Sequence, residues 1–157
     1  MSEDAYFDYR AYSKFATNMG KVEKDFIKFL KLFLLQQAQR VVAAAKPRTP
    51  VDTGALRESW SIGKEAKVLK YSSDGKVESV DYSSKFSRKA SVQDIKVVGK
   101  NLQVVISNPM EYASYIEYGH HSYEGRYMLT ISINEVEQAM PQRFKKSFTE
   151  FIRSKGV

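Results

Sequence analysis

Two adjacent histidines, His120 and His121, lie close in sequence to the carboxylates Glu117 and Glu124. Imidazole and carboxylate groups bind zinc and related ions, so these residue types first suggest a metal centre. Neighbouring histidines in an extended loop point apart, however, and no third ligand stands at a recognised metal-ligand spacing. We therefore predict polar loop residues here and no metal site.

Nucleophilic, acid-base and nucleotide chemistry also lack their usual residue patterns. The chain has no cysteine, and none of its serines lies in a Gly-x-Ser-x-Gly elbow. Glu135 and Glu137 are two residues apart, which directs them to different sides of a helix. No Gly-x-x-x-x-Gly-Lys or Gly-x-Gly-x-x-Gly loop is present. The sequence therefore predicts no catalytic residue and no cofactor, and a protein that is not an enzyme.

The net charge of +7 raises a different possibility, a nucleic-acid partner. The basic residues are spread from Arg10 to Lys155 and alternate with acidic ones, so no block of five or six like charges forms. A row of tyrosines beside Arg126 can stack on bases, or pack in a core and a subunit interface: Tyr112, Tyr115, Tyr118, Tyr123 and Tyr127. A basic nucleic-acid-binding module therefore stays open as the alternative function.

Length and composition predict a single globular domain over residues 1–157. Hydrophobic residues make up 43% and charged residues 27% of the chain, which is typical of globular proteins. The absence of cysteine excludes disulfides and thiolate zinc sites. No secretory leader is recognised and no apolar stretch reaches about 18 residues, so we expect neither export nor a membrane span.

The elements that position these side chains begin with a long amphipathic helix, predicted over residues 21–46. Its apolar residues recur at three- and four-residue steps, while most of its lysines fall on the other side. Leu32 and Leu35 widen the apolar surface beyond one stripe, which predicts a second contact, with a neighbouring subunit as the obvious partner. Residues 1–20 form an aromatic segment that we expect to contain a shorter helix ending near Gly20.

A chain reversal is predicted after this helix. Pro47 cannot continue the helix beyond residue 46, and further turn-forming residues follow: Pro50, Asp52, Thr53 and Gly54. The polar pair before Gly54 is suited to capping exposed amides of the next short turn, and the glycine permits a backbone geometry that other residues resist. Residues 56–69 are predicted as strand, with Trp60 and Ile62 on one face.

Residues 70–90, rich in Ser, Lys and Asp, are predicted to form an exposed loop or a mobile hairpin. Residues 92–98 and 102–106 flank a Gly-Lys-Asn turn and predict a β-hairpin. Residues 112–118 then show helical spacing that Gly119 ends.

A C-terminal helix is predicted over residues 127–152, with Pro141 able to start a new helical segment. The predicted fold class is α+β, with the long N-terminal helix and the C-terminal helix packed on a small antiparallel sheet of three to four strands.

Two segments together resemble the tail-completion family of long-tailed phages and prophages, the gene-product-ten-like minor tail components. The first, Thr49-Pro-Val-Asp-Thr-Gly-Ala-Leu-Arg-Glu-Ser59, is similar to the family's Pro-Val-Asp-Thr-Gly-x-Leu signature after a charged helix. The second, Asn108-Pro-Met-Glu-Tyr-Ala-Ser-Tyr-Ile-Glu-Tyr-Gly-His120, is similar to its Tyr-Ala-x-Tyr-(Val/Ile)-Glu-(Tyr/Phe)-Gly-(His/Thr) signature. The resemblance covers the chain from about residue 15 onward, and residues 1–15 inherit no role from it.

This resemblance implies a structural virion protein of the phage neck or tail top, made in the host cytoplasm. Such subunits assemble as a homo-oligomeric ring, typically a hexamer, that completes the tail and joins it to the head. The implied partners are connector or stopper proteins on one side and tail terminator or tail tube proteins on the other, with DNA passing through the lumen. The motif residues expected to serve turn geometry or interfaces are Pro50, Asp52, Thr53, Gly54, Leu56, Tyr112, Tyr115, Glu117, Tyr118 and Gly119.

Overall fold

A single long helix dominates the computed structural model, which describes residues 9–51, 54–63 and 89–156. This helix, α1 (Tyr9–Arg48), runs without a break through Gly20, so the predicted division into two helices is wrong. An isolated glycine costs a helix only about 1 kcal/mol relative to alanine, and good helix-forming residues flank this one. Asp52, Thr53 and most of the predicted 70–90 loop lie outside the described residues.

The C-terminal end of α1 lies two residues beyond the predicted end, with Pro47 inside its last turn. The carbonyls that a helix end leaves without backbone partners are bonded here by side chains. Arg48 Nη1 donates to the Ala44 carbonyl at 2.8 Å, and Thr49 Oγ1 donates to the Ala45 carbonyl at 2.8 Å. These side-chain bonds hold the last turn of α1, although the carbonyl that loses its backbone donor to Pro47 is that of Ala43.

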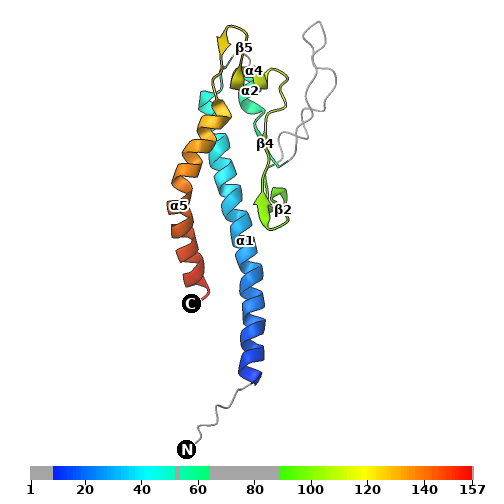
Figure 1. Cartoon of the computed structure of the whole chain (residues 1–157), viewed down its shortest axis with the longest axis vertical. Helices are drawn as coiled ribbons and strands as arrows, with labels where there is room; N and C mark the ends of the chain where they lie inside the picture. Colours follow the sequence, from blue (N-terminus) through cyan, green and yellow to red (C-terminus); the bar gives the residue numbers. More distant parts are fainter. Residues whose placement is uncertain (1–8, 52–53, 64–88, 157) are drawn as a thin grey trace, which may run out of the picture.

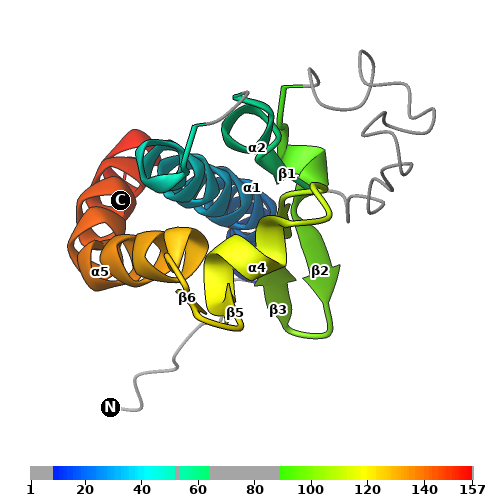
Figure 2. The same cartoon turned by 90° about the horizontal axis from the view of Figure 1, so that it is seen from above.

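The second long helix, α5 (Met128–Ser154), runs antiparallel to α1 and packs along it (Figure 1). It contains Pro141, which the sequence marked as able to start a new helical segment. Instead the helix continues through the proline and curves around α1 (Figure 2), as helices with an internal proline commonly do. Aromatic rings fill the contact between the two helices, from α1 (Phe26, Phe29 and Phe33) and from α5 (Phe144, Phe148 and Phe151).

The described strands are short and form three antiparallel two-stranded sheets. The sheets pair β1 (Ser61–Ile62) with β4 (Ile106–Ser107), β2 (Lys96–Val98) with β3 (Asn101–Gln103), and β5 (Gly119–His120) with β6 (Tyr123–Glu124). The α+β class and the hairpin around Gly99 are thus confirmed. Among the described strands, none joins a sheet of more than two strands, whereas one sheet of three to four strands was expected.

Two predicted strands begin as helical turns. Residues predicted as the start of the strand over 56–69 form α2 (Ala55–Glu58), and only β1 is strand in the described part of that range. The predicted strand over 92–98 opens with the 3-10 turn η1 (Val92–Asp94). There the Ser91 amide donates to the Asp94 carboxylate at 2.8 Å, so a local capping box replaces strand pairing.

The buried core lies at one end of the molecule, where α1 ends and α5 begins (Figure 1). A short helix, α4 (Ala113–Tyr118), and α2 close over this end, as predicted for residues 112–118. The buried core residues come from five different segments: Ala45, Leu56, Trp60, Met110 and Met128. No helix among the described residues is long and apolar enough to cross a membrane.

Candidate functional site

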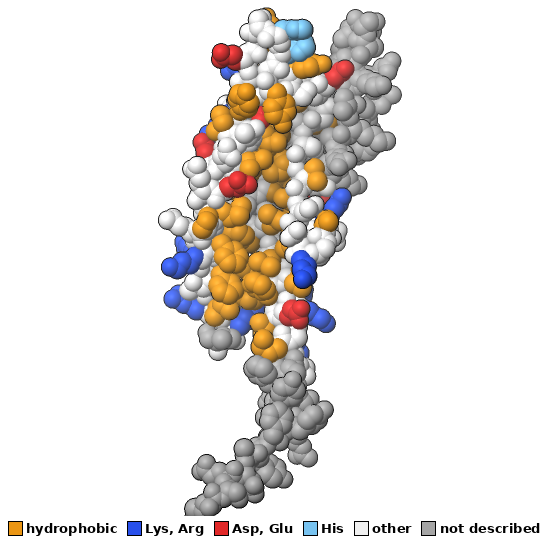
Figure 3. Space-filling view, viewed as in Figure 1, with side chains coloured by type: hydrophobic (Ala, Val, Ile, Leu, Met, Phe, Trp, Pro, Cys, Tyr) orange, Lys and Arg blue, Asp and Glu red, His pale blue; other side chains and the backbone are white. Residues whose placement is uncertain are grey.

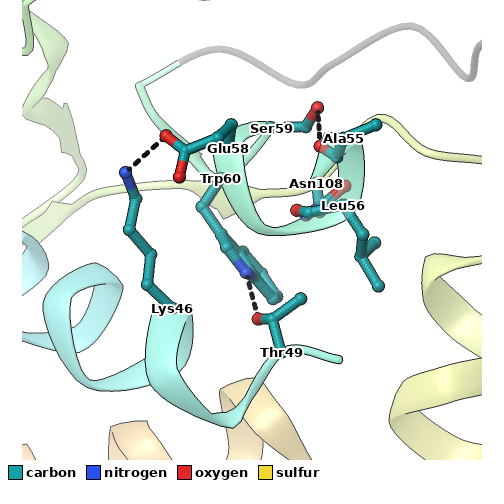
Figure 4. A network of polar contacts seen from close by, with 8 residues as sticks. All are labelled: Lys46, Thr49, Ala55, Leu56, Glu58, Ser59, Trp60 and Asn108. Carbon is teal, nitrogen blue, oxygen red and sulfur yellow. Dashed lines mark hydrogen bonds and ion pairs between the residues drawn. The ribbon is translucent and has the colours of Figure 1, made fainter. Parts of the chain in front are cut away.

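The two sequence motifs meet at the core end of the molecule. Asn108 Nδ2 of the second motif donates to the Leu56 carbonyl of the first at 2.7 Å (Figure 4). The Asn108 Oδ1 atom accepts from the Met110 amide at 3.2 Å, so one side chain both fixes its own turn and holds α2. The Leu56 side chain points into the core and is buried. The motifs are therefore two parts of one structural unit.

A tryptophan and a threonine connect this unit to the end of α1. Trp60 Nε1 donates to Thr49 Oγ1 at 2.9 Å, and both residues are buried (Figure 4). Since Thr49 Oγ1 donates in turn to the Ala45 carbonyl, the indole is linked to the last turn of α1. Pro50 follows as a half-buried residue, and Gly54 has a left-handed φ of 82° at the start of α2. Glycine is the residue that adopts this left-handed conformation most readily.

Glu117 is the charged residue of the second motif that the fold buries, with 7% of its surface exposed. Its Oε2 accepts from the Leu129 amide at 2.9 Å, and its Oε1 accepts from the Thr130 amide at 2.9 Å and the Thr130 hydroxyl at 2.7 Å. The carboxylate therefore satisfies free amides in the first turn of α5, where a negative charge is also favoured by the helix dipole. Glu117 fastens α4 to α5.

The β5–β6 hairpin between these helices depends on two glycines. Gly119 has φ 87° and ψ 164°, and a Cβ atom there would lie 2.6 Å from the Tyr123 carbonyl oxygen. A Cβ atom on Gly125 would lie 2.6 Å from the Glu117 carbonyl oxygen. The backbone also joins at this point, because the Tyr127 amide donates to that same carbonyl at 3.0 Å. The hairpin is held against α4 by close backbone contacts.

Replacing Gly119 by alanine is expected to lower the free energy of unfolding by about 2–3 kcal/mol, because the new side chain meets both a glycine-only backbone conformation and a backbone atom. Gly99→Ala is the matched control, since Gly99 also has a positive φ, of 61°, but has open space around it. The control is expected to lose only about 1 kcal/mol. Urea denaturation followed by circular dichroism measures both values, and equal losses would contradict the close contact at Gly119.

The tyrosines divide into one buried partner and an exposed set. Tyr112 is half-buried and packs against the core. The others lie on or beside the β5–β6 hairpin with between 45% and 79% of their surface exposed, and we call them the tyrosine surface: Tyr115, Tyr118, Tyr123 and Tyr127. The predicted row therefore has its main part on the outside, where it is available to a partner.

The two histidines form the tip of the same hairpin. Contrary to expectation they do not point apart: their ring centroids are 3.9 Å from each other, and His120 also lies 4.5 Å from the Tyr115 ring. A turn with a left-handed His121, φ 52°, brings the rings together. Within residues 9–51, 54–63 and 89–156, no group of three metal-ligating side chains is found. The pair extends the tyrosine surface instead.

A second surface lies toward the other end of the two long helices. There, apolar side chains gather along the line between α1 and α5 (Figure 3). They include a groove of about 290 Å³, which we call the phenylalanine groove, lined by Phe29, Leu32, Phe33, Gln36, Ser147, Glu150, Phe151 and Ser154. Beyond it, Lys155 Nζ donates to the Asp25 carboxylate at 2.5 Å, and this bond lowers the pKa of Asp25. The ion pair marks where α5 ends along α1.

Comparison with protein families finds a match to the family described as "Bacteriophage HK97-gp10, putative tail-component", over residues 13–119. The chain belongs to this family. The matched range contains the first motif and the second as far as Gly119, whereas His120, Gly125 and the start of α5 lie outside it. Comparisons with curated proteins and with solved structures found no match.

In this member of the phage tail-component family, the two motifs meet the end of α1 and the start of α5 at a junction. Several residues of this junction were not among the predicted site residues. Asn108, Trp60 and Gly125 carry contacts between segments that are distant in sequence. Asn108 precedes a proline, so the sequence alone indicates only a break in secondary structure at this position. Gly125 lies three residues before α5, and no sequence pattern around it indicated a close backbone approach.

Proposed function

We propose that this tail component forms a ring, with six subunits expected, that completes the head-proximal end of the phage tail and joins it to the head connector. The observation that carries the proposal is that residues at the second motif have two different roles. Its Glu117 and Gly119 hold the hairpin in place, whereas Tyr118 and Tyr123 expose 70% and 79% of their surface. The motif thus builds a rigid support for exposed aromatic side chains.

Such an arrangement suits a binding surface. Tyrosine is enriched in protein interfaces, because its ring supplies apolar area and its hydroxyl a hydrogen bond. A side chain presented by a fixed hairpin also loses less conformational freedom on binding than one on a loose loop. Mechanical joining needs this kind of contact and requires no catalytic residue.

A closed ring needs two different surfaces on each subunit. The tyrosine surface and the phenylalanine groove are two such different surfaces, because they lie toward opposite ends of the molecule. In the proposed assembly the ring occupies the virion neck, after assembly in the host cytoplasm. Connector or stopper proteins bind one side, tail terminator or tube proteins bind the other, and DNA passes through the lumen.

Deletion of the gene from an inducible host, followed by negative-stain electron microscopy, tests the proposal. We expect separate filled heads and free tails, because the joint between them is missing. Normally joined particles would refute the joining role and would favour the alternative of a basic nucleic-acid-binding module.

Complementation with Tyr118→Ala then tests the tyrosine surface. The variant is expected to fold with its stability unchanged to within about 0.5 kcal/mol, because exposed side chains contribute little to the core. Joined particles are expected to fall at least tenfold, since truncating an aromatic side chain at an interface centre commonly costs 2 kcal/mol or more. Val97→Ala, on the exposed β2 strand, is the control and should restore joining.

A further inference from the structure

Positive charge is concentrated on the part of the two long helices that lies away from the core. Residues 17–31, in α1, and 143–156, at the end of α5, contain nine basic and three acidic residues. The other described residues between 32 and 142 contain eight basic and seven acidic residues. Lysine and arginine side chains accordingly line both edges of the lower half of the described structure (Figure 3). The fold thus gathers at one end a charge that the sequence spreads.

Four lysines of α1 form a row along one side of this helix, and we call them the lysine row: Lys21, Lys24, Lys28 and Lys31. Their steps of three and four residues place them on one face. Lys24 and Lys31 lie roughly 140–160° around the helix from Phe29, which contacts α5. The first three lysines are exposed and Lys31 is half-buried. The lysine row therefore faces away from α5.

The same side of α1 is buried farther along the helix. Leu35 and Ala38 continue the row at steps of four and three residues, and only 5% and 2% of their surfaces are exposed. The fold covers this side of α1 where it carries apolar residues and leaves it open where it carries lysine.

The charge of the lysine row is not neutralised by ion pairs. Among the residues that the structure describes, no carboxylate is ion-paired with any of these four lysines. Asp25 lies three residues before Lys28, but its carboxylate bonds to Lys155. At the core end, by contrast, Lys46 pairs with Glu58. Lysines at these steps repel one another and destabilise a helix, so helix stability does not account for the row.

The chemistry of the lysine row matches a phosphate backbone. Lysine is depleted in protein–protein interfaces, whereas lysine commonly contacts the phosphates of nucleic acids. From Lys21 to Lys31 the row is about 15 Å long. One strand of duplex DNA carries a phosphate about every 3.4 Å along its axis, so about four phosphates lie opposite four lysines.

We propose that the lysine row binds the phosphate backbone of duplex DNA without reading its sequence. The row lies within one subunit, so this contact requires neither the proposed ring nor the joining of head and tail. Loss of either proposal therefore leaves the other standing, and purified protein is sufficient for the test.

Fluorescence anisotropy of a labelled duplex of about 20 base pairs, titrated with the full chain between about 50 and 200 mM salt, tests the proposal. The logarithm of the affinity is expected to fall against the logarithm of the salt concentration with a slope of about −3.6 per bound subunit, because each neutralised phosphate contributes about −0.9. The double variant Lys24→Gln, Lys28→Gln should make this slope shallower by about 1.8 per bound subunit.

The double variant Lys145→Gln, Lys146→Gln is the matched control. It removes the same charge from exposed positions on α5, across α1 from the lysine row, and should leave the slope unchanged. All four substituted positions are exposed, so circular dichroism should show an unchanged fold for both variants. Equal effects of the two variants would show that net charge, and not the row, binds DNA. A wild-type protein that does not bind the duplex also overturns the proposal.

Competition with poly-glutamate separates DNA from an acidic protein as the partner. Unlabelled duplex is expected to displace the labelled duplex at a much lower concentration of negative charge than poly-glutamate, because its phosphates match the spacing of the row. Equal displacement by the two competitors would assign the row to an acidic protein surface and reject DNA.

Discussion

Met128→Ala is expected to lower the free energy of unfolding by about 2–5 kcal/mol, the usual cost of truncating a large buried aliphatic side chain. Met128 is fully buried and is the first residue of α5. Its side chain packs in the core cluster with Leu56 of the first motif and Met110 of the second. The cavity therefore opens where α1, both motifs and α5 meet, and few other substitutions loosen so many elements together.

Urea denaturation followed by tryptophan fluorescence measures this loss, because the single tryptophan, Trp60, lies in the same core. Met128→Leu nearly conserves volume and should cost less than about 1.5 kcal/mol. Met19→Ala, at an exposed methionine, should change stability by less than about 0.5 kcal/mol. A loss below 1 kcal/mol for Met128→Ala would show that this core is not tightly packed.

Glu117→Ala is expected to lower the free energy of unfolding by about 3 kcal/mol. The substitution leaves the Leu129 and Thr130 amides without their carboxylate acceptor and removes a negative charge from the start of α5. Each buried donor left unsatisfied costs about 1–3 kcal/mol, and the lost helix-dipole interaction adds up to about 1 kcal/mol. Because the Glu117 carboxylate joins α4 to α5, the hairpin between them should also lose its fixed position.

Two controls isolate the contribution of the carboxylate. Glu117→Gln keeps one acceptor oxygen but turns an amide group toward one backbone amide, so we expect an intermediate loss of about 1–2 kcal/mol. Glu137→Ala removes an exposed carboxylate from α5, the helix that Glu117 caps, and should change stability by less than about 0.5 kcal/mol. Thermal denaturation orders the three variants, and an equal effect of Glu117→Ala and Glu137→Ala would reject the capping role.

The helices were the most predictable part of the fold, because their apolar residues repeat over many turns. The stripe of phenylalanines on α1 and its counterpart on α5 form the observed contact between these helices. The hairpin around Gly99 was predictable for a related reason, since a short glycine turn between β-branched runs is a local signal. The helix boundaries predicted at Gly20 and Pro47 were wrong, and α5 also continues through Pro141, because the flanking residues outweigh a single helix breaker.

The strands and the junction were less predictable, because distant residues decide them. β1 and β4 are two residues long and pair across 46 positions between Ser61 and Ser107. A strand of two residues is too short to show the alternation of apolar and polar residues from which strands are predicted. Within the second motif, Glu117 and Tyr118 are adjacent polar residues, yet the first is buried by its bonds to α5 and the second is exposed. Only the three-dimensional position of α5 separates their roles.

The length of α1 has a mechanical consequence. From Ala45 in the core to Tyr9 at its start, this unbroken helix spans about 54 Å. It acts as a lever, so a rotation of only 10° about the core would swing the far end by about 9 Å. In the proposed ring, a slight change of angle at the motif junction would become a large displacement at the far end of α1, which would let identical subunits adjust to rings of different diameter.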